Sequence, residues 1–362
     1  ADSRSMGRFK SIEEESGVPF FHEVGSLVVM ADSIASRTEK ILRQCEDDGI
    51  KVNSLTVPAM RERFPYLSMP SIAGGVHGLY EEHLAGYLNP PQLVKAQLKL
   101  AERAGAQLYR GTVHGVSEAN AGEVRKLDIE LGGEMQTVHA KTVLIATGAF
   151  ANFLDVLPAD RKLALYPYTE PNLLYELDEQ AAQELSGMPA VVTVDPEDTG
   201  TNNMTIYLVP PVRYPDGKTY VRIGPGMQPI VRELNNLSEM REWYLAQEIT
   251  EKQKKFLKGM LTTLLPDVRP VKECTATCVI EKTPTRYFYT GSISDDGALR
   301  VVTGGNGHGA RGSDEIGRIA AKDVLGDAWD FPLPRETFTP VFLADVKHGQ
   351  DSGFLKPPFG LC

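Results

Sequence analysis

A stretch near the C-terminal end, VVTGGNGHGARGSDEIG (301–317), contains the residue pattern in this sequence that most strongly suggests a ligand-binding site. Gly307, Gly309 and Gly312 follow the G-x-G-x-x-G spacing of dinucleotide-binding loops, with an apolar run before them and helix-forming residues after them. Such a loop places backbone N–H groups and a helix N-terminus next to small residues. This arrangement suits a negatively charged or carbonyl oxygen.

The complete dinucleotide-binding unit is not predicted at this position. It requires a second strand that ends in Asp or Glu about 20 residues after the glycines. The nearest acids, Asp327 and Asp330, lie in DAWDFPLPRETFTP, which is rich in proline and poor in strand-forming residues. The spacing therefore predicts an oxygen-binding turn between a strand and a helix, and it leaves open a turn that binds no ligand.

Composition places the chain among ordinary globular proteins and argues against several classes of function. Of 362 residues, 42% are hydrophobic and 24% are charged, and the formal net charge is −10, with acidic and basic residues interspersed. This balance argues against nucleic acid or an anionic membrane as the main partner. No apolar run reaches the roughly 18–20 residues of a membrane span. We expect a soluble, intracellular protein of unspecified compartment and oligomeric state.

The four cysteines predict neither a disulfide framework nor a metal site. The nearest pair, Cys274 and Cys278, lacks the C-x-x-C spacing and the histidine partners of a zinc site. We therefore predict no bound metal.

The elements that must position the glycine loop form two kinds of sheet. The apolar runs TVLIATG (142–148) and LRVVTGG (299–305) predict a buried parallel sheet. Alternating residues between 163 and 223 predict an antiparallel sheet that is exposed on one face, and residues 19–32 predict a hairpin bent at Gly25. Strand-like segments between 106 and 141 predict a meander. Helices are predicted over 7–18 (ending at Gly17), 33–50, 89–105 (capped by Asn89), 237–266 (one helix or two) and 313–326.

Several segments together resemble the FAD-dependent amine and amino-acid oxidoreductases of the D-amino-acid oxidase superfamily. The resemblance is closest to the monomeric sarcosine oxidase and N-methyltryptophan oxidase branch. It runs over nearly the whole chain and is most specific in GYLNPPQLVKA (86–96), GTVHGV (111–116), VLIATGAF (143–150), CVIEKTPTRYF (278–288) and GNGHGARGSDEIG (305–317). It implies that the glycine loop lets the backbone approach the flavin ring, where the helix dipole stabilises negative charge on reduced flavin.

The resemblance also implies a fold and a division into domains. The fold is α/β (α+β overall), with a Rossmann-like parallel sheet that binds FAD and an antiparallel sheet that binds substrate. The FAD-binding domain would comprise 1–20, 86–160 and 295–362, and the substrate-binding domain 21–85 and 161–294. The N-terminal strand–helix unit that carries the family's own glycine fingerprint is absent from this sequence. We expect either part of a longer chain or a relative that cannot bind ADP.

FAD is the cofactor that the resemblance implies, and several residues are carried over to it. Cys278 aligns with the cysteine that forms a thioether to the flavin 8α-methyl group. A covalent flavin and a buried core cysteine both stay open here, with Cys274 as the nearby alternative thiol. The other residues expected to contact FAD are Arg4, Val113, Thr147, Gly148, Gly305, Gly307 and Gly309.

Two arginines and a histidine are the predicted catalytic residues. Arg311 falls where the family places a basic residue for the substrate carboxylate, a role that suits the bidentate guanidinium. Arg222 stands where the oxidases carry a lysine that promotes the reaction of flavin with O2, so both O2 and another electron acceptor stay open. His308 would contact flavin or substrate. Tyr168 and Tyr207 would either face the pocket or belong to the core.

The predicted reaction is oxidation of a small amine or an N-methyl amino acid that carries a carboxylate. A hydride passes to flavin N5, and the imine product hydrolyses in water. One alternative is a 2-hydroxy-acid dehydrogenase of the same fold, which needs a base for the hydroxyl proton. A second alternative is a non-catalytic relative that acts as a binding subunit.

Overall fold

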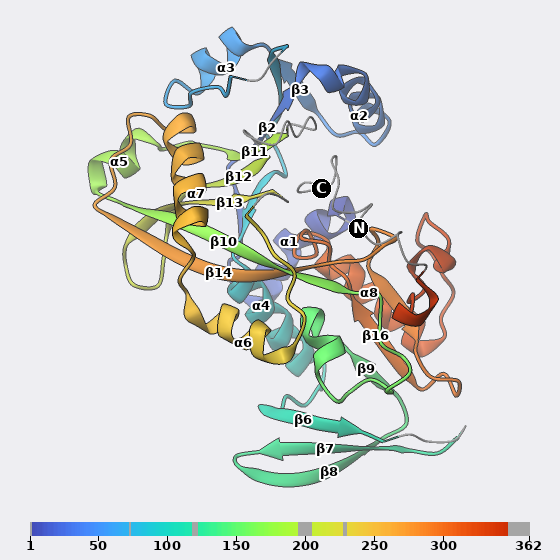
Figure 1. The fold of residues 1–362 in the computed structure, drawn as a ribbon. Coiled ribbons are helices and arrows are strands. Elements are labelled where there is room, and N and C mark those ends of the chain that lie inside the picture. Colours follow the sequence, from blue (N-terminus) through green and yellow to red (C-terminus); the bar gives the residue numbers. More distant parts are fainter. Residues whose placement is uncertain (1, 72–73, 118–121, 195–204, 227–229, 347–362) are drawn as a thin grey trace.

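The computed structural model describes residues 2–71, 74–117, 122–194, 205–226 and 230–346 (Figure 1). The fold is mixed α/β, which confirms the predicted class. Its helices are α1 Asp2–Ser16, α2 Ala35–Asp47, α3 Val57–Arg63, α4 Pro90–Arg103, α5 Glu179–Glu184, α6 Leu237–Ala246, α7 Glu251–Leu264 and α8 Ser313–Leu325. In the part of the chain that the structure describes, no helix is both long and apolar enough to cross a membrane.

The largest sheet has eight strands in the order β14-β10-β13-β12-β11-β2-β4-β3. All neighbouring strands run antiparallel except β11 and β2, which are parallel. The bounds of the strands are β2 Ser26–Ala31, β3 Val52–Leu55, β4 Val76–Glu81, β10 Tyr166–Leu177, β11 Ala190–Val194, β12 Ile206–Arg213, β13 Thr219–Pro225 and β14 Lys272–Lys282.

The two faces of this sheet differ in chemistry because side chains alternate along a strand. Leu173 and Tyr175 on β10 and Ile223 on β13 belong to the main hydrophobic core. Helix α7 contributes Leu257 and Leu261 to the same core, and Figure 1 shows it crossing the strands of this sheet. The opposite face of these strands holds polar side chains, which form part of the candidate site.

Strand β10 corrects one expectation from the sequence. We expected the sheet between residues 163 and 223 to be exposed on one face, but β10 is buried at every position after Tyr166. The hydrophobic core covers one face, and the polar residues Glu170 and Asn172 on the other face are also almost fully buried. Polar residues in alternation therefore mark an enclosed polar site on this strand rather than a solvated face.

The predicted parallel pairing of the two apolar runs is confirmed, but their predicted burial on both faces is wrong for β9, where Leu144 is 40% exposed. Strand β9 Val143–Ile145 pairs in parallel with β16 Leu299–Thr303, and β15 Tyr289–Ser292 pairs antiparallel with β16. The chain passes directly from β16 through the glycine loop into α8. Between α8 and residue 346, the last described one, the chain forms two short 3-10 helices, Arg335–Phe338 and Leu343–Asp345, and not the second strand of a dinucleotide-binding unit.

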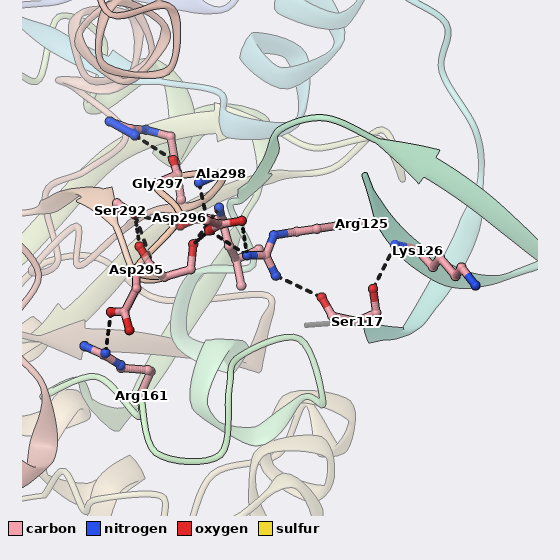
Figure 2. Close-up of polar contacts among 12 residues, drawn as sticks. Ser117, Arg125, Lys126, Arg161, Ser292, Asp295, Asp296, Gly297 and Ala298 are labelled. Atoms are coloured by element: carbon pink, nitrogen blue, oxygen red, sulfur yellow. Dashed lines mark hydrogen bonds and ion pairs between the residues drawn. The ribbon is translucent and has the colours of Figure 1, made fainter. Parts of the chain in front are cut away.

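The predicted meander is a three-stranded sheet of β6 Gly111–Val116, β7 Arg125–Leu131 and β8 Glu134–Ala140. A buried ion pair joins it to the turn between β15 and β16 (Figure 2). The Arg125 guanidinium donates to both carboxylate oxygens of Asp296 at 2.7 Å and to the Ser117 carbonyl at 2.9 Å. Arg125 is 3% exposed and the side chain of Asp296 is 5% exposed.

The predicted hairpin at residues 19–32 is wrong. Strand β1 Phe21–Glu23 pairs with β5 Gly86–Leu88 in a separate two-stranded sheet, whereas β2 belongs to the large sheet. The bend at Gly25 exists, with a φ of 81°, and a Cβ there would lie 2.8 Å from the Tyr80 hydroxyl. The bend therefore directs the chain from one sheet into another instead of back onto itself.

Two local signals in the sequence predict helix ends that the structure confirms, whereas α1 begins at Asp2, five residues before its predicted start at residue 7. Asn89 caps α4 by accepting a hydrogen bond from the Gln92 N–H, and Gly17 closes α1 with a φ of 67°. The stretch 237–266 forms two helices, α6 and α7. They are separated at Gln247, which has a φ of 52°, and Thr250 forms a capping box at the start of α7.

Candidate active site between the polar sheet face and the glycine loop

The glycine loop folds tightly on itself between β16 and α8. Gly304 has a φ of 82°, and a Cβ on it would lie 2.6 Å from the Thr283 methyl carbon. Gly305 and Gly309 face each other so closely that a Cβ on Gly305 would lie 3.2 Å from the Gly309 Cα. Glycine is thus required here both for backbone conformation and for close approach.

The end of β14 holds this loop in place. Glu281 Oε1 accepts hydrogen bonds from the Gly304 and Gly305 N–H groups, both at 3.0 Å. Lys282 Nζ donates to the Asn306 carbonyl at 2.6 Å. Two N–H groups of the loop donate to Glu281, and the His308 N–H donates to the Gly305 carbonyl at 3.0 Å, so these three are already used within the protein.

Glu281 also brings a second predicted segment to the loop. Its Oε2 lies 3.7 Å from the position of a Cβ on Gly148, which has a φ of 56°. Thr147 is the N-cap residue of the 3-10 helix Gly148–Phe153. The structure therefore brings Thr147 and Gly148 close to the loop at Gly304–Gly305.

A cavity of about 510 Å³ opens beside the loop. Both predicted residues His308 and Arg311 line it, together with Arg286 and aromatic rings from the segment before β15. On its other side lies α1, which contributes Met6. The α8 N-cap, Gly312, has no side chain, so the positive end of the helix dipole is not covered by a side chain of its N-cap residue.

These features fit the electron-rich edge of a flavin ring. The glycine surfaces admit a flat ring, and the helix N-terminus and the guanidinium groups favour negative charge on a carbonyl oxygen. A second cavity of about 650 Å³ adjoins this region between α4 and α8, where Leu93, Leu98, Ala310 and Ser313 line it. Two neighbouring cavities suit an elongated ligand more than a small one.

The polar face of the large sheet forms a cluster centred on Asn172. The Asn172 Oδ1 accepts hydrogen bonds from the Tyr207 hydroxyl at 2.6 Å and from Arg222 Nε at 2.9 Å. The Tyr207 ring lies over Gly224, where a Cβ would meet the ring at 2.2 Å. Glu170 stands two residues before Asn172 on the same face of β10 and is 5% exposed.

Cys278 faces Glu170 across the β10–β14 pair, as its direct register partner. Burial, and next to it the Glu170 charge, raise the pKa of the Cys278 thiol, and nearby Arg222 opposes the shift. The thiol is therefore protonated at neutral pH. Cys274, the alternative thiol, lies four positions earlier on the same face, opposite Leu174. Cys45 and both of these cysteines are free, and Cys362 lies outside the described residues.

Glu170 is the acidic side chain of this cluster, and burial changes its pKa. Burial raises its pKa to about 8, although the Tyr207 hydroxyl and the charges of Arg222 and Lys282 act in the opposite direction. Burial and the Glu170 charge also raise the pKa of Tyr207. The cluster thus contains a carboxyl group that gains or loses a proton near neutral pH.

The remaining predicted residues lie apart from this cluster. Val113 is on β6 of the meander and is 38% exposed. Arg4 binds Glu315 at the start of α8, with 2.9 Å between Nη1 and Oε1, and lies over the Phe331 ring. Of the two tyrosines, Tyr207 belongs to the polar cluster, whereas Tyr168 is 4% exposed and packs in a small hydrophobic cluster.

Sequence reasoning did not find Glu170, Asn172, Glu281 or Lys282. A usable signal existed in β10, where Glu170 and Asn172 occur two positions apart in a strand that is rich in apolar and aromatic residues. Polar residues at this spacing share one face, and a buried polar face requires partners. The second signal was Glu281–Lys282, a charged pair directly after the apolar residues of β14.

Comparisons with known proteins support this arrangement. A family model described as FAD dependent oxidoreductase (DAO) matches residues 2–322. No curated protein matches the chain significantly. Among similar solved structures, NikD, described as an unusual amino acid oxidase essential for nikkomycin biosynthesis, is 20% identical, with a TM-score of 0.68 over 94% of this chain and 82% of that chain.

Two further structures show the same fold. L-proline dehydrogenase from P. horikoshii is 19% identical with a TM-score of 0.69, covering 93% of this chain and 80% of that one. Glycine oxidase from Geobacillus kaustophilus is 18% identical with a TM-score of 0.67, covering 93% and 81%. At these identities the structures establish the fold and leave substrate open. With the family model covering most of the sequence, the superfamily predicted from the sequence is confirmed, and this chain belongs to the DAO family of FAD-dependent oxidoreductases.

Proposed function

We propose that this protein oxidises a small amine or amino acid that carries a carboxylate and passes the electrons to FAD. The observation that carries the proposal is the cavity beside the glycine loop. Arg311, Arg286 and His308 line it at the N-terminus of α8, in a chain whose family uses FAD. A cavity with two guanidinium groups suits a substrate carboxylate next to an electron-accepting ring.

Residues from two segments would hold the flavin ring. These are Thr147–Gly148 and the loop Gly304–Gly309. The Glu281 carboxylate accepts hydrogen bonds from the loop and lies close to Gly148. FAD, when bound, accepts a hydride from the substrate carbon. We assign 1–20, 86–160 and 295–362 to the part that binds FAD, and 21–85 and 161–294 to the part that covers the substrate. The polar face of β10, β13 and β14 lies in the second part.

Arg311 would orient the substrate through its carboxylate. A fixed carboxylate leaves the substrate nitrogen and its neighbouring carbon in one position, which lowers the entropic barrier to hydride loss. The similar structures named an amino acid oxidase, an L-proline dehydrogenase and a glycine oxidase support a substrate of the amino-acid class. Imine hydrolysis needs only water after product release.

Oxidation of a 2-hydroxy acid is the second candidate, and one observation favours it. This reaction needs a base for the hydroxyl proton, and the chain holds a buried carboxyl group, Glu170, whose pKa burial raises to about 8. Lactate in the substrate panel separates the two candidates, because an amine oxidoreductase is reduced by amino acids and not by lactate.

The test is anaerobic bleaching of the flavin absorption in the full-length holoprotein by sarcosine, L-proline, glycine and lactate. Arg311→Gln should lower kcat/KM for the best amino acid roughly 10- to 150-fold, as expected for a lost charged hydrogen bond. The same variant should change little with the matching amine that lacks a carboxylate. Arg241→Gln, an exposed arginine on α6, is the control. Equal losses on both kinds of substrate would contradict the role of Arg311.

Acid precipitation of the same holoprotein decides how FAD is attached. Colour that stays with the pellet in the wild type and is lost in Cys278→Ser would establish a covalent bond at this thiol. Colour released into the supernatant by the wild type would establish non-covalent FAD. The raised pKa of the Cys278 thiol favours the second result, since the thiolate is the nucleophile.

A further inference from the structure

The cavity beside the glycine loop is lined by an acidic side chain whose role the proposed function leaves unassigned. This residue is Glu81, the last residue of β4. The other charged residues that line the cavity are Arg286 and Arg311. Glu81 is the one acidic residue among the described residues of its lining, so the cavity offers two guanidinium groups and one carboxylate.

Strand pairing in the large sheet fixes the face on which Glu81 lies. Its neighbour Tyr80 belongs to the main hydrophobic core, so the Glu81 side chain is on the opposite face of the sheet. Leu79 shares this opposite face, and direct register partners on β2 and β11 connect it to Tyr207 of the polar cluster. Glu81 therefore belongs to the polar face, and β2 and β3 hold its backbone from both sides.

The charge of Glu81 has no counterion in the part of the chain that the structure describes. None of the described residues donates a hydrogen bond to its carboxyl group or forms an ion pair with it, and burial raises its pKa. The nearby Cys45 thiol is protonated at neutral pH, because burial and then the Glu81 charge raise its pKa. A partly buried carboxylate without a counterion is unfavourable, and a cationic ligand would remove this cost.

Two guanidinium groups and one carboxylate in a single cavity are complementary to a zwitterion. The guanidinium groups favour the carboxylate of a ligand. Glu81 favours a positively charged nitrogen on the same molecule. A simple carboxylic acid or a 2-hydroxy acid offers no such nitrogen and would leave the Glu81 charge unpaired.

We propose that Glu81 binds the positively charged nitrogen of the substrate amino acid and thereby selects amino acids over other carboxylates. The inference rests on the proposed function, because it assigns a residue to the nitrogen of that substrate. No covalent bond is made or broken in this contact, since the carboxylate attracts the ammonium group and accepts a hydrogen bond from its N–H. The same oxygen accepts from the neutral amine, so the nitrogen stays fixed beside the carbon that loses the hydride.

Two ligands of the same shape test this contact without turnover. Trimethylglycine and 3,3-dimethylbutanoate both carry a carboxylate, and they differ in a quaternary nitrogen that replaces a quaternary carbon. The nitrogen of trimethylglycine has no lone pair, so it cannot form an imine. Titration of the full-length holoprotein, followed by the flavin absorption, gives both Kd values. The wild type should bind trimethylglycine roughly tenfold more tightly than 3,3-dimethylbutanoate, because only the first ligand is attracted by a carboxylate.

Three variants identify the source of this preference. In Glu81→Gln the two Kd values should become equal, because the amide keeps the size of the carboxylate without its charge. Glu82→Gln is the matched control and should keep the wild-type ratio, since Glu82 is 49% exposed and binds Arg63 at 3.1 Å. Arg311→Gln should weaken both ligands by the same factor, because both carry the carboxylate. A disturbed fold would also weaken both ligands together, so the ratio of the Kd values reports the Glu81 charge.

The outcomes separate the two proposals. Equal Kd values in the wild type overturn the role of Glu81, while bleaching of the flavin by an amino acid leaves the proposed function standing. A preference for trimethylglycine that persists in Glu81→Gln also overturns this role, and it would assign the cation to aromatic rings of the cavity such as Tyr287 and Phe288. If neither ligand binds and no amino acid reduces the flavin, both proposals fail. A preference that is lost in Glu81→Gln and kept in Glu82→Gln supports the role of Glu81.

Discussion

Replacing Asp296 should detach the β6–β7–β8 meander from the rest of the protein. Asp296 accepts two 2.7 Å hydrogen bonds from Arg125, and both side chains are at most 5% exposed. Figure 2 shows that the same carboxylate also accepts from the Ala298 N–H in its own turn. Removing it leaves a buried guanidinium without its counterion. Such a loss costs about 3–5 kcal/mol, which is roughly 4–7 °C in Tm for a chain of 362 residues.

The neighbouring residue supplies the control. Asp295 binds Arg161 at the same 2.7 Å, but its side chain is 91% exposed, and exposed ion pairs contribute little. Thermal unfolding of Asp296→Ala and Asp295→Ala, with limited proteolysis at residues 117–140, therefore compares one buried and one exposed pair in the same turn. Equal shifts in Tm would refute the reasoning. The double variant Arg125→Met/Asp296→Leu should regain much of the loss, because it leaves no unpaired buried charge.

The same pair predicts a dependence on pH. The Ser294 hydroxyl, together with the Ala298 N–H and Arg125, holds the pKa of Asp296 below its ordinary value of 3.8, although burial acts against this. A carboxyl group whose pKa is lowered by folding contributes stability at pH values above its unfolded pKa and loses it as pH falls. Tm should therefore drop below about pH 4 in the wild type and drop less in Asp296→Asn.

Three further predictions concern the glycine loop and its neighbours. Glu281→Ala should weaken FAD binding about tenfold, because two loop N–H groups lose their acceptor at a cost of about 1–3 kcal/mol. Equilibrium titration of the apoprotein with FAD measures this affinity, and an unchanged affinity would contradict the prediction. Gly304→Ala should lower the free energy of unfolding by about 1–3 kcal/mol, since Gly304 combines a φ of 82° with a contact at 2.6 Å between the added Cβ and Thr283. Gly297→Ala is the control for the backbone strain alone, because Gly297 has a φ of 75° and open space around its Cβ position. Arg222→Met should slow the reoxidation of reduced flavin by O2, because a nearby guanidinium would stabilise superoxide. Stopped-flow mixing measures this rate, and an unchanged rate would favour another electron acceptor.

Local features of the sequence were sufficient for much of the fold. Continuous apolar runs predicted the parallel pair β9–β16, because such runs are typical of strands in parallel sheets, although Leu144 of β9 is 40% exposed. Asn89 and Gly17 predicted helix ends for reasons confined to a few neighbouring residues. The glycine loop itself was found from spacing, and the structure adds that its glycines serve a tight fold.

Features set by distant pairing were not predictable in this way. Gly25 is compatible with a hairpin or with a change of sheet, and only the partners β5 and β4 decide between them. Glu170 meets Cys278 and Lys282 because β10 pairs with a strand about a hundred residues later. Burial of β10 on both faces, and with it the raised pKa of Glu170, depends on that pairing and on the helices that cover it.

The most direct test of the central claim is a visible absorption spectrum of the full-length purified protein, before and after anaerobic addition of sarcosine or L-proline. The account predicts a yellow flavoprotein whose absorption bleaches with at least one of these amino acids and returns when an electron acceptor is added. A colourless protein that takes up no added FAD, or a yellow one that no amino acid bleaches, would contradict it.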